Sequence, residues 1–526
     1  MMDATPAHQR KPVLYSIPTQ ETHRVRCKTE RVVEVSRRAV IVGGSVLAGA
    51  AVLGGAGYWF GTNADRIFNG GVGGGTATGA AGTEPERLVS ANGSLVVDLV
   101  AEKTIHDING QRAQLMTYNG TLPGPTWVAH PGDTITVNFT NKLGEHTNLH
   151  THGFHVSSMG NSDNIMVHLA DGESFTYKYK LADDHPTGLF WYHPHNHGNV
   201  TNQLFAGLYG AILVTPTEAP KVDAERVLVL SDISLDSSGL PAKPSMMWQM
   251  MGREGDTLLV NGQVQPTYTA GKGGVERWHI VNSCAARYMN LSVRGGKATI
   301  IGKDSGQVAN PYSPASFVIA PGNRIDLIVE LGEGVVNLEY TTVPHPDMMG
   351  MSGTLYKNYP LASFVPSAAA TVTAVPAIAT SAGIDLRKQT PAVRRTFTLK
   401  MPGMGSGGMG GMMNGESMEG KFTINDQAFD MSVINTTVQV GTVEEWTIVN
   451  TSTMAHPFHL HVWPMQVLTI GPDAMTDVQY QDVVNVPAKN QTVVRVHFDQ
   501  FPGTTVYHCH ILDHEDLGMM GALEAK

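Results

Sequence analysis

The sequence has little charge and little cysteine. Charged residues make up 16% of the 526 residues, and the formal net charge is −10. Because nucleic acids attract basic surfaces, this balance argues against a nucleic-acid partner and is compatible with binding of metal cations. There are only three cysteines, of which Cys27 and Cys509 lie in segments described below. Cys284 has no evident partner, so we predict no disulfide and a buried, small apolar role for this residue.

No long amphipathic helix is evident, and strand patterns take its place. Apolar residues alternate with polar ones over 135–139 and again over 325–331, as expected for strands. The 57 glycines are typical of a chain with many tight turns. The sequence therefore predicts an all-β protein.

The N-terminal part contains one long apolar run, from Ala39 to Phe60, directly after Ser36-Arg37-Arg38. As a helix this run would span about 33 Å, enough to cross a bilayer. The paired arginines resemble a twin-arginine export signal. We expect an exported protein, periplasmic or in the cell envelope, with the run either cleaved off or retained as a membrane anchor. Residues 61–84 are rich in Gly, Ala and Thr, which predicts a flexible tether.

One unit of sequence occurs three times in the remaining chain. Each copy has an Asn in a turn, followed by a strand that ends in a second Asn. The pairs are Asn119 with Asn141, Asn261 with Asn282, and Asn425 with Asn450. The first Asn of successive copies are 142 and 164 residues apart, which is the size of a domain. We predict three β-sandwich domains at 85–216, 217–375 and 376–526, with boundaries near Thr215-Pro216 and in the Ala/Thr/Pro-rich run 365–383.

Four His-x-His pairs stand out in these domains. They are His150 with His152, His193 with His195, His459 with His461, and His508 with His510. On a strand, alternate side chains share a face, so both imidazoles of a pair point the same way. Eight convergent imidazoles are too many for one metal ion and about right for three.

The last pair encloses Cys509, which points to the opposite face of its strand. Cys509, His514 and Met519 supply a thiolate, an imidazole and a thioether, and His456 has the parity to join them. This is the ligand set of a blue-copper electron-transfer centre. The covalent path from Cys509 to His508 and His510 would connect that centre to the imidazole cluster. A core strand with a buried thiol and hydrogen-bonded histidines is the alternative.

Over residues 85–526, this pattern resembles the three-domain, laccase-like multicopper oxidases. The resemblance implies cupredoxin-like Greek-key β-sandwich domains, four copper ions, and one-electron oxidation of a substrate coupled to reduction of O2 to water. It assigns the type 2 copper to His150 and His459. One type 3 ion would be bound by His152, His193 and His510, and the other by His195, His461 and His508. The type 1 ligands would be His456, Cys509, His514 and Met519.

The resemblance also implies two acidic residues that supply protons to bound oxygen. Glu515 stands where the family often has one. The other is expected eleven residues after His150, where this chain has Asn161, so we predict that Asp163 takes the role. His155 and His197 lie beside the motifs at spacings that the pattern does not use, and we expect them outside the ligand set.

The sequence has 25 methionines, and their uneven distribution points to a metal ion as the substrate. Six of them fall in a Gly-rich stretch: Met401, Met404, Met409, Met412, Met413 and Met418. Thioethers favour Cu(I). Met454 occupies a position that resembles a substrate-copper ligand of cuprous oxidases, although Ser452 replaces the Asp that those enzymes carry. We therefore expect a monomeric oxidase of Cu(I) that serves copper tolerance.

Three alternatives remain: a laccase acting on phenols or aromatic amines, a non-catalytic copper-binding relative, and a copper nitrite reductase. The complete set of ten histidines and Cys509 disfavours the non-catalytic relative, and a nitrite reductase would have two domains and fewer His-x-His pairs.

Overall fold

The computed structural model describes residues 80–216, 218–342, 358–378, 380, 383–402 and 421–526. The apolar run 39–60, Cys27 and five of the predicted substrate ligands lie outside these residues: Met404, Met409, Met412, Met413 and Met418. Among the described residues, no helix combines the length and the hydrophobicity that a membrane span requires.

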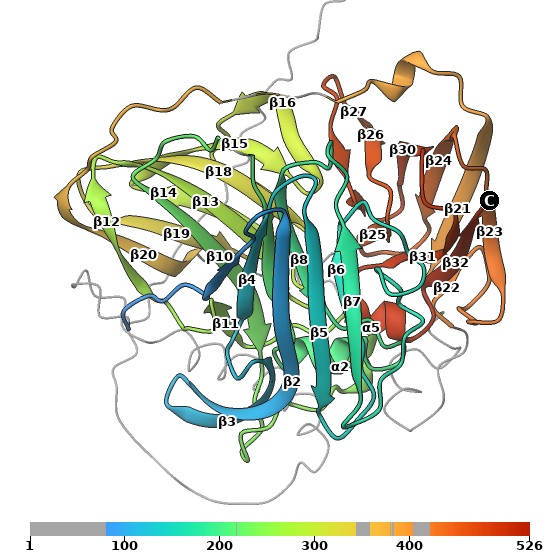
Figure 1. The fold of residues 1–526 in the computed structure, drawn as a ribbon, viewed down its shortest axis with the longest axis horizontal. Helices are drawn as coiled ribbons and strands as arrows, with labels where there is room; N and C mark the ends of the chain where they lie inside the picture. The colour runs from blue at the N-terminus through green and yellow to red at the C-terminus, as the bar shows by residue number, and fades with distance from the viewer. Residues whose placement is uncertain (1–79, 217, 343–357, 379, 381–382, 403–420) are drawn as a thin grey trace, which may run out of the picture. The chain divides into compact units, whose positions relative to one another are not determined.

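The first sandwich consists of two sheets that enclose one apolar core (Figure 1). One sheet has the order β1 (Arg87–Val89), β4 (Gly124–Ala129), β9 (Gly210–Val214), β8 (Gly188–His193) and β6 (His150–His152). The other has the order β3 (Gln111–Tyr118), β2 (Ser94–Ile108), β5 (Thr134–Lys142) and β7 (Ser174–Lys180). Ile135, Val137 and Phe139 of β5 are buried and the residues between them are more exposed, which confirms the predicted alternation.

The second sandwich has the same two-layer construction around its own core. One sheet has the order β11 (Thr257–Val260), β10 (Ala224–Ile233), β13 (Val275–Asn282), β18 (Arg324–Leu331), β15 (Gly296–Lys303) and β16 (Gly306–Tyr312). The other has the order β12 (Thr267–Lys272), β20 (Asn358–Ala369), β19 (Val336–Thr341), β14 (Met289–Arg294) and β17 (Phe317–Ile319). Cys284 is buried in this core as a free thiol, as predicted.

The third sandwich carries the C-terminal motifs. One sheet has the order β22 (Thr423–Ile424), β21 (Val393–Lys400), β24 (Thr442–Asn450), β30 (Gln491–Phe498), β26 (Met465–Ile470) and β27 (Asp473–Ala474), and β28 (Tyr480–Gln481) also pairs with β26. The other has the order β23 (Ile434–Val438), β32 (Met520–Ala525), β31 (Gly503–Cys509), β25 (His456–Leu460) and β29 (Val483–Val486). The all-β prediction is confirmed, whereas the domain boundaries near 216 and within 365–383 stay predictions.

Short helical turns occur in the connections. They are α2 (Val200–Phe205), α3 (Met246–Met251), η1 (Leu386–Lys388) and α5 (Leu512–Asp516). A buried apolar cluster joins residues of β8 and β9, of β10 and β13, and Leu512 of α5. All three sandwiches therefore share one contact region. In strand β18, Arg324 and Asp326 are buried together with the apolar residues, and only Glu330 is partly exposed, so the strand is buried on both faces over most of its length.

The repeated unit has the same backbone geometry in all three sandwiches. Asn119, Asn261 and Asn425 have φ values of 53°, 51° and 54°. The left-handed region is open to few residues besides Gly and Asn. In each case the side-chain oxygen accepts a hydrogen bond from a strand N–H, at 2.7, 2.8 and 2.7 Å. The sequence repeat is therefore a structural repeat.

Candidate metal centres

Two pairs of neighbouring strands carry the histidine pairs. In the first sandwich, β6 is antiparallel to β8 and His150 lies opposite His193. In the third sandwich, β25 is antiparallel to β31 and His459 lies opposite His508. Each register thus sets one histidine of one pair opposite one histidine of another. His195, His461 and His510 lie just past the ends of β8, β25 and β31.

The structure gathers all eight imidazoles at the contact between these two sheets. The Nε2 atom of His508 lies 3.2 Å from the Nε2 atoms of both His195 and His461. The His152 ring stacks on the His459 ring with centroids 3.8 Å apart. The eight residues are nearly inaccessible to solvent, with exposed fractions of 2% or less. Residues far apart in the sequence therefore form a single buried cluster.

Within the cluster, some of the predicted ligand sets are compact. The ligand atoms of His195, His461 and His508 all lie within 4.8 Å of one another, which is the set predicted for one type 3 ion. The second predicted type 3 set is less compact. The His510 ring is 4.9 Å from that of His152 and 5.8 Å from that of His193, measured between centroids.

The rings predicted for the type 2 ion, His150 and His459, have centroids 6.0 Å apart. Each of these two residues also belongs to a compact group with other histidines, such as the group of His150, His459 and His461.

The outward nitrogen of several imidazoles is fixed by a hydrogen bond. The Nδ1–H groups of His150, His193, His459 and His508 donate to Asp163 (2.9 Å), Pro194 O (2.9 Å), Asp482 O (2.8 Å) and Cys509 O (3.1 Å). A neutral imidazole that donates from one nitrogen keeps a lone pair on the other. The hydrogen bonds therefore leave the Nε2 lone pairs for the interior of the cluster.

Several interior nitrogens have no hydrogen-bond partner among the described residues. They are His150 Nε2, His459 Nε2, His461 Nδ1 and both ring nitrogens of His510. Burial, together with the neighbouring imidazoles, lowers the pKa of His152, His193, His459, His461 and His510 well below 6.5. Burial lowers the pKa of His195 and His508 to about 3. Neutral imidazoles with unshared lone pairs are the donor set that transition metals such as copper bind, so the residues fit metal ions.

A second buried group contains the thiol. Cys509 Sγ lies 3.4 Å from His456 Nδ1 and 3.8 Å from His514 Nδ1. The opposite ring nitrogens are anchored, His456 Nε2 at 2.8 Å from Ser452 Oγ and His514 Nε2 at 3.1 Å from Met250 O. Met519 is fully buried in the same apolar cluster as Cys509. The structure therefore brings the four predicted type 1 residues into one region.

Burial raises the pKa of the Cys509 thiol. A metal ion binds cysteine as the thiolate, so metal loading at this site would release a proton.

Both predicted acidic residues lie beside the imidazole cluster. Asp163 is buried and accepts hydrogen bonds from His150 and from Thr151 N (2.8 Å), so it is not a solvated loop residue. Glu515 is also buried, with Oε2 3.0 Å from His508 Nδ1. Burial raises the pKa of Glu515 to about 7, so this carboxyl can both accept and release a proton near neutral pH.

The remaining candidate residues, two histidines beside the motifs and two methionines, agree with the sequence predictions in part. His155 and His197 lie outside both groups, and His155 Nδ1 donates instead to Val462 O at 2.9 Å. Met454 is only 4% exposed, and Met401 is partly buried against the third core. These two methionines are therefore less accessible than a surface site for substrate would be.

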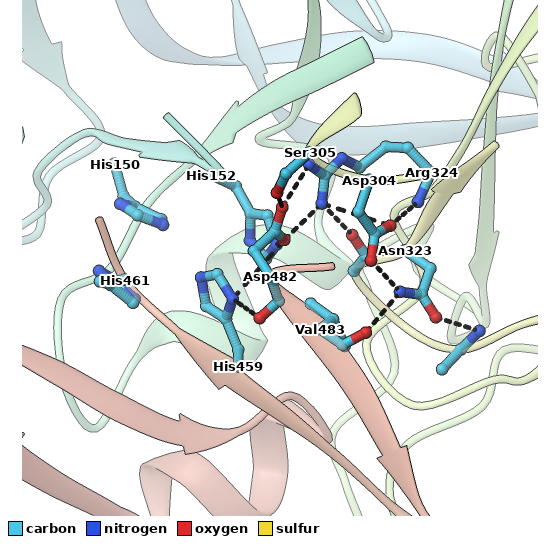
Figure 2. A network of polar contacts seen from close by, with 12 residues as sticks. His150, His152, Asp304, Ser305, Asn323, Arg324, His459, His461, Asp482 and Val483 are labelled. Carbon is cyan, nitrogen blue, oxygen red and sulfur yellow. Dashed lines mark hydrogen bonds and ion pairs between the residues drawn. The ribbon is translucent and has the colours of Figure 1, made fainter. Parts of the chain in front are cut away.

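Sequence reasoning missed Asp482 and Arg324. Asp482 Oδ1 lies 3.0 Å from His152 Nε2, and its carboxylate pairs with Arg324 (Figure 2). These two residues are 158 positions apart in the sequence. Neither stands in a His-x-His motif, so only tertiary contacts reveal them.

Comparison with known proteins assigns the family. Residues 99–219, 227–350 and 406–526 each match a multicopper oxidase family. The chain belongs to the multicopper oxidases. The oxidase is 28% identical over 421 residues to "Multicopper oxidase mco" of Staphylococcus haemolyticus, which covers 77% of this chain and 83% of the relative. It is 25% identical over 456 residues to "Cell division protein FtsP" of Xenorhabdus nematophila, covering 83% of this chain and 90% of the relative.

Among solved structures, the oxidase is similar to the multicopper oxidase of Campylobacter jejuni, described as a metallo-oxidase. The TM-score is 0.74 and the identity 28%, over 85% of this chain and 95% of that one. As a family member, the protein is a copper-binding oxidoreductase with cupredoxin-like sandwiches that uses O2 and a reducing substrate.

Proposed function

We propose that this oxidase couples the one-electron oxidation of Cu(I) to Cu(II) to the four-electron reduction of O2 to water, with four resident copper ions. The observation that carries the proposal is the placement of three consecutive residues at the end of β31. Cys509 lies in the thiol site, while His508 and His510 lie in the imidazole cluster. Electrons collected at the thiol site would reach the cluster through a few covalent bonds.

The resident copper ions would supply the one-electron redox chemistry, and the protein residues would hold them in the sets that the family implies. His456, Cys509, His514 and Met519 would bind the type 1 ion. His150 and His459 would bind the type 2 ion. The type 3 pair would be bound by His152, His193 and His510, and by His195, His461 and His508.

Two carboxyl groups would serve the oxygen chemistry. Glu515 is positioned against His508 and His195, with a pKa near 7 that suits proton transfer at neutral pH. Asp163 fixes the His150 ring through Nδ1 and so keeps Nε2 directed toward the cluster.

Helix α3 supports Cu(I) as the substrate. Its residue Met250 accepts the hydrogen bond from His514 Nε2, so the helix covers the outer side of the thiol site. Met246 and Met247, on the same helix, are each 38% exposed. Thioethers bind Cu(I) well, and these two stand on the helix whose Met250 main-chain oxygen holds His514. Full burial of His514 disfavours direct contact with a bulky phenol. The description of the Campylobacter jejuni protein as a metallo-oxidase points the same way.

The cellular role that we propose is copper tolerance outside the cytoplasm. The Arg37-Arg38 pair before the apolar run 39–60 would direct export, and oxidation of Cu(I) would take place in the periplasm or cell envelope.

The test is oxygen uptake by the copper-loaded oxidase with Cu(I) and, separately, with a phenol. We compare the wild type with the double variant Met246→Leu/Met247→Leu. The variant should keep its blue absorption and its phenol kinetics, while KM for Cu(I) rises about tenfold, since about 1.4 kcal/mol of binding is lost. Met166→Leu is the matched control because Met166 is also exposed (40%) but lies outside α3.

Unchanged Cu(I) kinetics in the double variant would show that α3 is not part of the substrate site. If the wild type oxidises the phenol readily and fails to accelerate Cu(I) oxidation, the oxidase is a laccase.

A further inference from the structure

Arg324 lies at the place where the three sandwiches meet. It is the first residue of β18 in the second sandwich, and it is fully buried. Its Nε donates to Leu189 O in the first sandwich at 3.0 Å. Its two terminal nitrogens donate to Asp482 in the third sandwich, at 2.5 Å to Oδ1 and 2.6 Å to Oδ2 (Figure 2). One side chain thus bonds all three sandwiches together.

Asp482 in turn contacts two copper-ligand candidates from different sandwiches. Its Oδ1 lies 3.0 Å from His152 Nε2, and its main-chain oxygen lies 2.8 Å from His459 Nδ1. Both oxygens are acceptors, so each imidazole carries its proton on the nitrogen that faces Asp482. The other nitrogens, His152 Nδ1 and His459 Nε2, then keep their lone pairs. Of these, His152 Nδ1 lies 3.4 Å from His193 Nε2, within the cluster.

We propose that Arg324 and Asp482 are a positioning pair that sets the tautomer and the orientation of His152 and His459, and thereby makes correct copper loading depend on the docking of the second sandwich. This inference rests on membership of the oxidase family and is independent of whether Cu(I) is the substrate. Neither residue touches a reacting atom. Their effect on the reaction passes through the two histidines.

The surroundings of the pair leave Asp482 little freedom to move. Ser305 Oγ donates to Asp482 Oδ2 at 2.6 Å. Asp304 accepts from Arg324 N at 2.8 Å and from Asn323 Nδ2 at 2.7 Å. The Asp482 carboxylate is therefore occupied by Arg324 and Ser305. For this reason we interpret its closeness to His152 and His459 as orientation of the two rings, not as a further metal ligand.

Gly153, directly after His152, is part of the same arrangement. It has φ +85°, and a Cβ added there would lie 2.4 Å from Arg324 Nη2 and 2.8 Å from Asp482 Oδ2. Only glycine leaves room for the guanidinium to approach the carboxylate at this point. The glycine that follows the first His-x-His motif therefore has a steric reason to be there.

The experiment compares Arg324→Met and Asp482→Asn with a matched control, each purified as the copper-loaded protein. Arg277→Met is the control because Arg277 forms a buried pair with Asp326 on the same sheet. The readouts are copper per chain, blue absorption, the type 2 signal in electron paramagnetic resonance, and the melting temperature. Arg324→Met and Asp482→Asn should keep the blue absorption, lose one or more copper ions per chain, and show a changed type 2 signal. Arg277→Met should lower the melting temperature while copper content and type 2 signal stay as in the wild type.

A wild-type copper content and type 2 signal in Arg324→Met and Asp482→Asn would overturn the proposal, even with a lowered melting temperature. If these variants do not fold, Gly153→Ala provides the test, because it keeps both partners while its added Cβ crowds them and its positive φ strains the backbone beside His152. A changed type 2 signal in Gly153→Ala supports the positioning role, and an unchanged signal refutes it.

Discussion

Each buried histidine in the two metal sites has two ring nitrogens, and the partner of one decides the use of the other. His456 and His514 are anchored through Nε2 by Ser452 Oγ and Met250 O, so that Nδ1 faces Cys509. His150 is anchored through Nδ1 by Asp163, so that Nε2 faces the imidazole cluster. Such hydrogen bonds to the distal nitrogen fix the ring orientation and the tautomer before the metal binds.

Cys509→Ser is the residue-scale prediction. Serine has no thiolate to bind the type 1 copper, so blue absorption and oxidase activity should both be lost. The imidazole cluster does not use the sulfur, and most of its copper should remain. Absorption spectra and copper content per chain measure the two effects. Substantial oxidase activity in this variant would contradict the proposed electron path through Cys509.

At the scale of structural elements, the repeated Asn turn supports all three sandwiches. Asn261 is the buried copy, with an exposed fraction of 4%. Its side chain accepts a hydrogen bond from Val229 N and donates one to Val227 O, both at 2.8 Å. The equivalent Asn425 is exposed, although its Oδ1 accepts the corresponding bond from Thr398 N. The two copies therefore separate the effect of burial from the effect of the turn itself.

Replacing Asn261 by Ala should destabilise the copper-free protein by about 2–4 kcal/mol, because a buried N–H loses its acceptor and alanine is strained at positive φ. Asn425→Ala should cost less, about 1–2 kcal/mol, since water can replace the lost hydrogen bond. Asn261→Gly removes the strain and isolates the hydrogen bonds. Denaturant unfolding measures all three variants, and equal losses for Asn261→Ala and Asn425→Ala would contradict the role of burial.

At the scale of the whole molecule, the imidazole cluster couples the first and third sandwiches. Nine histidines of the two sites have a pKa below the usual 6.5, mainly because they are buried. In the folded, copper-free protein they stay neutral at a pH where the unfolded chain takes up protons. Their contribution to stability is complete above about pH 6.5 and decreases as the pH falls toward their lowered pKa values.

The copper-free oxidase should therefore lose stability steeply between pH 7 and pH 5, by up to about 1.4 kcal/mol per pH unit for each proton taken up on unfolding. Copper keeps the imidazoles neutral and Cys509 as the thiolate, so unfolding with release of copper also takes up protons, and the loaded oxidase should lose at least as much stability over the same range. Melting temperatures of both forms at pH 7 and pH 5 provide the comparison. Nearly equal melting temperatures of the copper-free form at pH 7 and pH 5 would contradict the role of the buried histidines.

Much of the site follows from sequence because a strand has a side-chain period of two. The parity of His508, Cys509 and His510 places the thiol and the two imidazoles on opposite faces whatever the rest of the chain does. The three Asn repeats likewise predicted three similar sandwiches, since the same local hydrogen bonds recur wherever the turn recurs. The sequence favours Asp163 over Asn161, and the structure places Asp163, not Asn161, against His150.

What sequence alone determined is thus the chemistry of each strand: which side chains share a face, and that thiol and imidazoles diverge. Only the tertiary structure decided which imidazoles from different strands come close, that α3 covers His514, and that Arg324 and Asp482 brace the cluster. The physical reason is the distance along the chain over which each interaction acts. Strand parity is set by neighbouring peptide units, whereas these contacts depend on how separately folded sandwiches dock, through side chains that no local pattern relates.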